Sequence, residues 1–163
     1  MHSCCSGLCE IQKPADICKR CGTRGQTVGR ETMKSLLKPD ALNRLKPGAY
    51  FFDLAPNCEA VYFSNEQDLY FGKRDIRVPV GIKQKQPPTP ICYCLGHTLE
   101  SARAEIQATG QSTVSAHITK EIQAGNCACE VKNPSGRCCL GEVNKAVQKL
   151  LSELESVAAL AHR

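Results

Sequence analysis

The chain has 163 residues, of which 42% are hydrophobic, but only 5% are aromatic and tryptophan is absent. A chain of this size can form one or two small domains, and small domains with thin cores commonly need disulfides or metal ions to stay folded. Twelve cysteines could supply either cross-link, and the net charge of +5 is too dispersed to indicate a nucleic-acid-binding face.

The N-terminus indicates the compartment. Residues 1–13 contain no basic region followed by an apolar run, so we expect no secretory signal. No window approaches the length of a membrane-spanning apolar helix. We therefore expect a cytoplasmic protein, in which paired cysteines act as metal ligands or redox groups rather than as a disulfide framework. Residues 1–13 themselves are short, polar and aperiodic, and we interpret them as a flexible tail.

Residues 14–83 predict a small β-rich domain. Cys18 and Cys21 form a C-x-x-C pair, and Gly22 follows where a tight turn needs a positive φ. Short helical turns are expected at 32–37 and 39–45, because prolines end each of them. Runs rich in aromatic and β-branched residues then predict strands at 49–52, 60–63, 69–71 and 76–80.

Residues 84–90 (QKQPPTP) predict a semi-rigid linker, because prolines favour an extended chain. Beyond it, residues 91–163 have the three–four spacing of apolar residues that is typical of amphipathic helices. We expect three helices here, at 99–110, 114–125 and 140–160. His97 or Thr98 is expected to cap the first of them. The predicted fold class is therefore α+β, a small zinc-bound β-rich domain joined to a three-helix domain that binds an iron–sulfur cluster.

Six cysteines lie at the ends of the expected helices: Cys92, Cys94, Cys127, Cys129, Cys138 and Cys139. A [2Fe–2S] cluster needs four ligands, normally thiolates, that converge on a pocket. A C-x-C pair can bind from one loop, and a second pair must then come from elsewhere in the chain. Helix N-termini present free N–H groups and a positive dipole end, which suit an anionic cluster. We therefore interpret this half as an iron–sulfur site.

The cysteine pattern resembles that of two known types of protein. The C-x-C motif, the 32 residues between Cys94 and Cys127, and a closing cysteine before a helix are similar to [2Fe–2S] domains of the bacterioferritin-associated ferredoxin type. Those domains close with a compact C-x-x-C, where this chain has an insertion. Over about residues 14–151, and most clearly in CYCLGHT and AGNCACEVKNPSGRCCLGEV, the chain resembles the N-terminal domain of CopZ-type copper chaperones, which carries zinc and a [2Fe–2S] cluster.

The ligand set of the cluster follows in part from this resemblance. Cys92 and Cys94 form the first pair. Cys127 matches the ferredoxin spacing and Cys139 adjoins the expected start of the last helix, so we predict these two as the second pair. Cys129 and Cys138 are the alternates, and either could instead be buried as a small apolar residue.

The C-x-x-C pair of the first domain predicts a zinc site. A second C-x-x-C is normally its partner, but Cys58 is the only further cysteine near the expected strands. Zinc also accepts carboxylate oxygen, so Cys18, Cys21, Cys58 and Asp53 form a candidate Cys₃Asp set. The alternative role of Asp53 is that of a turn residue. Four protein ligands would make this zinc structural and would stabilise a domain with few aliphatic residues.

The remaining thiols and histidines give weaker signals. Cys4, Cys5 and Cys9 could capture a soft ion such as Cu(I) or Hg(II), or could have no role. His97 could donate a hydrogen bond near the cluster or cap a helix. His2, His117 and His162 carry no signal of their own.

By its resemblance the chain is expected to handle soft metal ions, copper or mercury, with the cluster as a one-electron carrier that could reduce Cu(II) to Cu(I). We expect a redox-active metal-binding protein rather than a dedicated enzyme. In the fused chaperones a further copper-binding domain follows. Because this chain stops at Arg163, we expect a separate metal chaperone, transporter or reductase as its partner, and no nucleic acid. The alternative is a ferredoxin-like electron donor to a reductase or storage protein.

Overall fold

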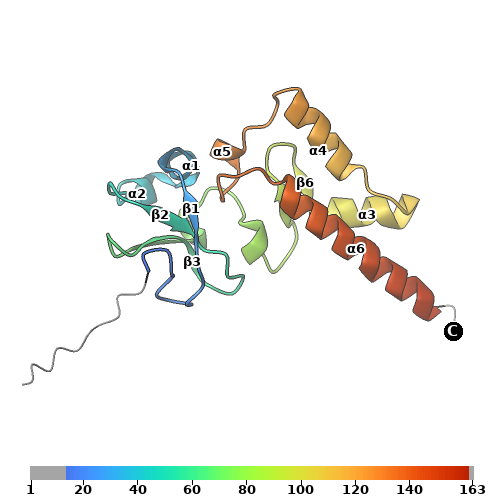
Figure 1. The fold of residues 1–163 in the computed structure, drawn as a ribbon, viewed down its shortest axis with the longest axis horizontal. Helices are drawn as coiled ribbons and strands as arrows, with labels where there is room; N and C mark the ends of the chain where they lie inside the picture. The colour runs from blue at the N-terminus through green and yellow to red at the C-terminus, as the bar shows by residue number, and fades with distance from the viewer. Residues whose placement is uncertain (1–13, 162–163) are drawn as a thin grey trace, which may run out of the picture.

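The computed structural model describes residues 14–161, so the predicted flexible tail and its candidate ligands Cys4, Cys5 and Cys9 lie outside the described residues. A small sheet with short helices occupies one end of the molecule, and long helices extend from it (Figure 1). The elements follow in chain order: β1 (Gln26–Val28), α1 (Arg30–Leu36), α2 (Pro39–Leu42), β2 (Tyr50–Phe52), β3 (Ala60–Ser64), β4 (Leu69–Gly72), the 3₁₀ turns η1 (Lys73–Asp75) and η2 (Gly81–Lys83), β5 (Pro90–Cys92), β6 (His97–Thr98), α3 (Leu99–Thr109), α4 (Val114–Gln123), α5 (Cys129–Lys132) and α6 (Leu140–Ala161). The fold class is α+β, as predicted.

The sheet of the first half is antiparallel, with strand order β1-β2-β3-β4. Every residue of β3 is buried, and its sequence accordingly shows a nearly continuous apolar run instead of alternating apolar and polar residues. Val61 and Tyr62 belong to the main core with α1. Ala60 and Phe63 belong to a smaller cluster beside Cys18 and Cys58. The central strand therefore connects the core to the candidate zinc ligands.

Two strand predictions in this half need correction. The predicted strand at 76–80 is wrong: Ile76 makes only an isolated bridge with Leu37, and Pro79 has no N–H to donate to a ladder. Instead, the chain turns through η1, where Asp75 accepts a hydrogen bond from the Gly72 N–H at 2.8 Å. The sequence analysis also missed β1, because this three-residue edge strand is mostly polar and carries no apolar alternation.

The helical half has its own core. Buried residues of α3, α4 and α6 meet there with Cys92 and Cys139. Thr98 caps α3 as predicted, because its Oγ1 accepts from the Ser101 N–H at 3.1 Å, and Gly110 ends that helix at φ 77°. The expected count of three helices is not confirmed, because a fourth, short helix (α5) forms in the cysteine-rich insertion and a β5–β6 ribbon precedes α3.

The apolar stripe of α6 extends further along the helix than its core does. Val143, Val147 and Leu150 are buried, whereas Val157 and Leu160 are 63% and 72% exposed. The last turns of α6 project beyond α3 and α4 (Figure 1). No helix among residues 14–161 is long and apolar enough to cross a membrane.

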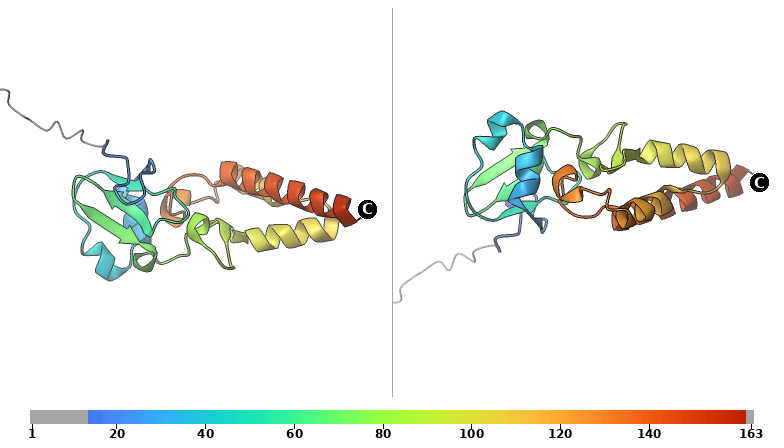
Figure 2. Two further views of the ribbon diagram at one scale, coloured as in Figure 1. Left: turned by 90° about the horizontal axis from the view of Figure 1, so that it is seen from below. Right: turned by 90° about the horizontal axis from the view of Figure 1, so that it is seen from above.

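The two halves are joined through the insertion that separates the last cysteines. Helix α5 lies beside α1 of the first half (Figure 2). Thr32 of α1 donates a hydrogen bond to the Glu130 carbonyl at 2.6 Å, and Tyr62 of β3 donates to the Pro134 carbonyl at 2.7 Å. Gly136 allows this close approach because it has no side chain: a Cβ at this position would lie only 2.7 Å from Thr32 Oγ1. The β-rich half thus contacts the insertion, which carries or adjoins four of the six candidate cluster ligands.

Candidate metal centres

The first metal centre begins with the loop between Cys18 and Cys21. The Cys18 N–H donates to the Thr23 carbonyl at 3.0 Å, and the Gly22 N–H donates to the Cys18 carbonyl at 2.8 Å. Gly22 adopts φ 74°, which glycine takes without steric cost. This tight turn directs both thiols of the C-x-x-C pair to one side, towards the loop that follows β2.

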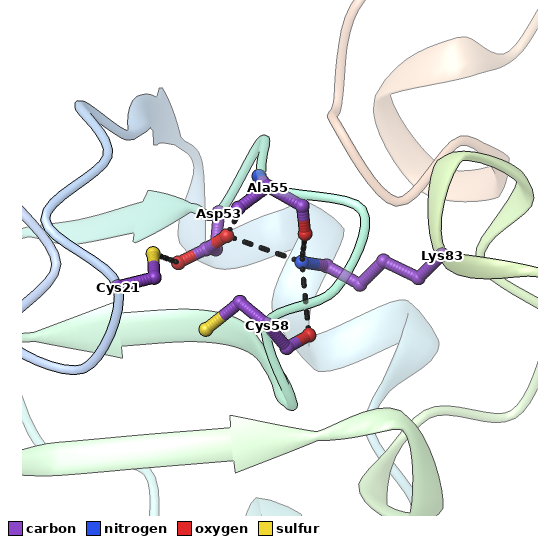
Figure 3. A network of polar contacts seen from close by, with 5 residues as sticks. All are labelled: Cys21, Asp53, Ala55, Cys58 and Lys83. Atoms are coloured by element: carbon purple, nitrogen blue, oxygen red, sulfur yellow. Dashed lines mark hydrogen bonds and ion pairs between the residues drawn. The ribbon is translucent and has the colours of Figure 1, made fainter.

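The loop after β2 supplies the other two ligands. Cys18, Cys21, Asp53 and Cys58 place one ligand atom each within 4.8 Å of one another. Asp53 Oδ2 accepts from Cys21 Sγ at 3.2 Å, as Figure 3 shows, and its Oδ1 accepts from the Ala55 N–H at 2.8 Å. In the described part of the chain this is the one group of three or more side chains that fits around a single ion. Three sulfurs and one carboxylate oxygen form a donor set that zinc accepts.

The electrostatics of this group favour a bound cation. Burial, together with a hydrogen bond to Asp53, raises the pKa of the Cys18 thiol to about 12. Burial also raises the pKa of Cys58. For Asp53, burial acts to raise the pKa, but hydrogen bonds from Cys18, the Ala55 N–H and Cys21, with the charge of Lys83, lower it overall. A divalent ion would displace the thiol protons and supply the charge that buried thiolates need.

Lys83 is a member of this centre that the sequence analysis missed. Its side chain is fully buried, and its ammonium donates to Asp53 Oδ1 at 3.1 Å. It also donates to the carbonyls of Ala55 at 2.7 Å and Cys58 at 3.3 Å (Figure 3). Lys83 therefore fixes one carboxylate oxygen and leaves the other for a metal. The only sequence signal was a basic residue near the linker, which gives no indication of burial.

We expect Lys83→Met to destabilise the zinc-loaded protein by about 3 kcal/mol, because it leaves a buried carboxylate oxygen and two buried carbonyls without their donor. Urea unfolding followed by circular dichroism, with zinc affinity measured against a chromophoric chelator, checks this result. Lys85→Met is the matched control, since Lys85 is exposed. Equal unfolding midpoints for the two variants would contradict the role given to Lys83.

The second centre lies where the β5–β6 ribbon meets the start of α6. The structure brings Cys94 and Cys129 together, with their sulfurs 3.5 Å apart, and the Ala128 N–H donates to Cys94 Sγ at 3.2 Å. Cys92 and Cys139 are both buried in the helical core. Cys139 directly precedes α6, and its carbonyl accepts the first helical hydrogen bond, from the Val143 N–H.

Cys92 and Cys139 are neighbours in the helical core. The proximity of the Cys139 thiol lowers the pKa of Cys92 to about 6, and the Cys92 thiol raises the pKa of Cys139. Burial raises the pKa of Cys129 to about 11, and burial together with neighbouring cysteines raises that of Cys127. Cys138 is exposed. Cys94 and Cys129 are thus in contact, while Cys92 and Cys139 influence each other's pKa and Cys94 contributes to the raised pKa of Cys127.

Histidine 117 is the second residue that the sequence analysis missed. Its Nδ1 lies 2.9 Å from His97 Nε2, so the two rings form a hydrogen-bonded pair beside the cysteines. Twenty residues separate them in the chain, and no motif of that spacing marks them. Only the folding of α4 against the β5–β6 ribbon brings them together.

Comparisons with known proteins show what the chain is similar to. Residues 15–77 match the family model described as the zinc binding domain of CopZ. The chain is 36% identical over 122 residues to a copper chaperone CopZ of Archaeoglobus fulgidus, an alignment that covers 75% of this chain and 57% of that relative. The X-ray structure of the CopZ N-terminal domain of Archaeoglobus fulgidus has a TM-score of 0.66 at 28% identity, covering 78% of this chain and 95% of that one.

The comparisons confirm the resemblance to the N-terminal domain of CopZ and its α+β fold. The aligned region spans little more than half the length of the chaperone it matches. The first half, with its Cys₃Asp group, corresponds to the zinc-binding part of that domain.

Proposed function

We propose that this chain, which resembles the N-terminal domain of CopZ-type copper chaperones, holds one structural zinc ion and one [2Fe–2S] cluster and takes part in copper handling by transferring single electrons. The observation that carries the proposal is the convergence of Cys92, Cys94, Cys129 and Cys139 on the helical core at the start of α6. The zinc ligands Cys18, Cys21, Asp53 and Cys58 leave no open position, so the zinc would stabilise the fold and take no part in chemistry.

The arrangement of the second centre fits a cluster better than a single ion. No three of its cysteines, all of which lie within the described residues, bring their sulfurs within 4.8 Å of one another. A binuclear cluster bridges two pairs of thiolates that stand further apart than the ligands of one metal. Cys92, Cys94, Cys129 and Cys139 would hold the cluster.

This assignment differs from the sequence-based set in one ligand. Ferredoxin spacing favours Cys127, whereas the distance of 3.5 Å to Cys94 favours Cys129. Cys129 also packs against the helical core, and the half-buried Cys127 does not. We therefore propose Cys129 as the fourth ligand, with Cys127 and Cys138 at the rim of the site.

The surrounding residues suit an anionic cluster. The N-terminus of the long helix α6 faces Cys139, and its positive dipole end stabilises negative charge on the thiolates. The Ala128 N–H already donates to Cys94 Sγ, and such bonds raise the reduction potential of a cluster. When bound, the cluster supplies one electron, enough to convert Cu(II) to Cu(I), the form that thiolates capture.

Protein prepared without oxygen should be brown and should contain about two irons and about one zinc per chain. Chemically reduced protein should then convert about one equivalent of Cu(II) to Cu(I), read with a Cu(I)-specific chelator. A colourless protein that binds only zinc would overturn the cluster. A brown protein that reduces no Cu(II) would support the ferredoxin-like alternative, an electron donor to a protein partner.

A further inference from the structure

Two histidines meet at the surface beside the second centre. His97 lies on β6 and His117 on α4, with Nε2 of the first 2.9 Å from Nδ1 of the second. Their rings are nearly perpendicular, at 87°. The His117 side chain is 46% exposed, so a dissolved ion can reach the pair.

The ribbon places this pair next to a proposed cluster ligand. Cys92 on β5 is the register partner of His97 on β6. Side chains of directly opposed residues lie on the same face of a ribbon, with Cβ atoms about 4.5–5.5 Å apart.

We infer that His97 Nε2 and His117 Nδ1 form a docking site for Cu(II), the substrate of the copper-handling role on which this inference rests. Imidazole nitrogens suit Cu(II), which prefers tetragonal geometry. The two nitrogens are held 2.9 Å apart by a shared proton, and an ion that replaced this proton would meet both of them.

The surroundings of the pair support a cation. Glu121 Oε1 lies 4.0 Å from His117 Nε2, one turn further along α4, and adds negative charge beside the pair. Glu105 adds a second negative charge near His97.

Cu(II) at this site would accept one electron from the reduced cluster and become Cu(I), while the cluster is oxidised by one electron and no proton is transferred. An external one-electron donor, such as a flavoprotein reductase, must reduce the cluster beforehand. Cu(I) prefers soft thiolates to two imidazoles, so it would leave the pair after reduction. The pair is thus a substrate site and not a storage site.

Electron paramagnetic resonance on the oxidised protein tests the binding, because the oxidised cluster is silent. The starting variant carries His2→Asn, Cys4→Ser, Cys5→Ser and Cys9→Ser, which removes an N-terminal copper chelate and the thiols most able to reduce the ion. One equivalent of Cu(II) should then give a tetragonal signal split by two nitrogens. His117→Asn and His97→Asn should each weaken binding at least tenfold, and His162→Asn should not.

The same signal in a His97→Asn/His117→Asn double variant would overturn the site. A second measurement separates this failure from that of the proposed function. Reduced protein mixed with a small amount of Cu(II) should be reoxidised at least tenfold more slowly in the double variant. Equal rates would overturn the docking site and leave copper reduction in place. Absence of reoxidation in both proteins would overturn copper reduction, and the resonance experiment would still decide whether the pair binds Cu(II).

Discussion

Replacing Cys92 or Cys94 by serine should give a protein that retains its zinc and holds no [2Fe–2S] cluster. Each substitution removes one of the four proposed ligands, all of which pack in the helical core. The Cys18 group lies in the other half of the chain and keeps all of its ligands. Visible absorption with iron and zinc analysis of anaerobic preparations checks this result, which is a complete loss of iron at unchanged zinc content.

The same measurement decides the disputed ligand. Cys129→Ser should lose the cluster, whereas Cys127→Ser should retain it, because Cys129 and not Cys127 approaches Cys94 to 3.5 Å. Cys138→Ser is the control, since Cys138 is exposed and is not one of the four proposed ligands. Iron lost from the Cys127 variant and kept in the Cys129 variant would show that ferredoxin spacing, and not this geometry, selects the fourth ligand.

The helical half was largely predictable because its signals are local. Thr98 and Gly110 end α3 through contacts with residues one turn away, and these follow from residue type alone. The expected zinc group likewise came together, since Cys58 was the only further cysteine near the strands. The short strand β1 and the failed strand at 76–80 depend on long-range pairing, which residue type does not encode.

The residues that the sequence analysis missed share one cause. Lys83 and His117 acquire their roles only through partners 20 to 30 residues away along the chain. From the sequence, a lysine before a proline-rich stretch is expected to lie in solvent, whereas the fold buries its ammonium against Asp53. The choice between Cys127 and Cys129 has the same origin, because α5 begins at Cys129 and Cys127 lies in the loop before it.

Removing zinc should shorten the lifetime of the cluster, although no zinc ligand contacts it. Without the ion, the loops that carry Cys18 and Cys58 lose their cross-link. Strand β3, whose Ala60 and Phe63 pack against these two cysteines, is then held less firmly. That strand carries Tyr62, which anchors the Pro134 carbonyl of the loop between α5 and α6. We expect Cys58→Ser to lose zinc and to bleach at least tenfold faster in air than the unaltered protein, measured as decay of visible absorption.

The anchor can be tested with zinc in place. Tyr62→Phe leaves the buried Pro134 carbonyl without a donor, which costs about 1–2 kcal/mol in a contact between the two halves. Amide exchange in residues 128–137 should accelerate and the cluster should bleach faster. Tyr50→Phe is the matched control, because its hydroxyl bonds only to Lys46 within the β-rich half. Equal bleaching in the two variants would mean that the halves hold their metals independently. A selective effect of Tyr62→Phe would mean that the zinc-bound half sets how long the cluster remains assembled.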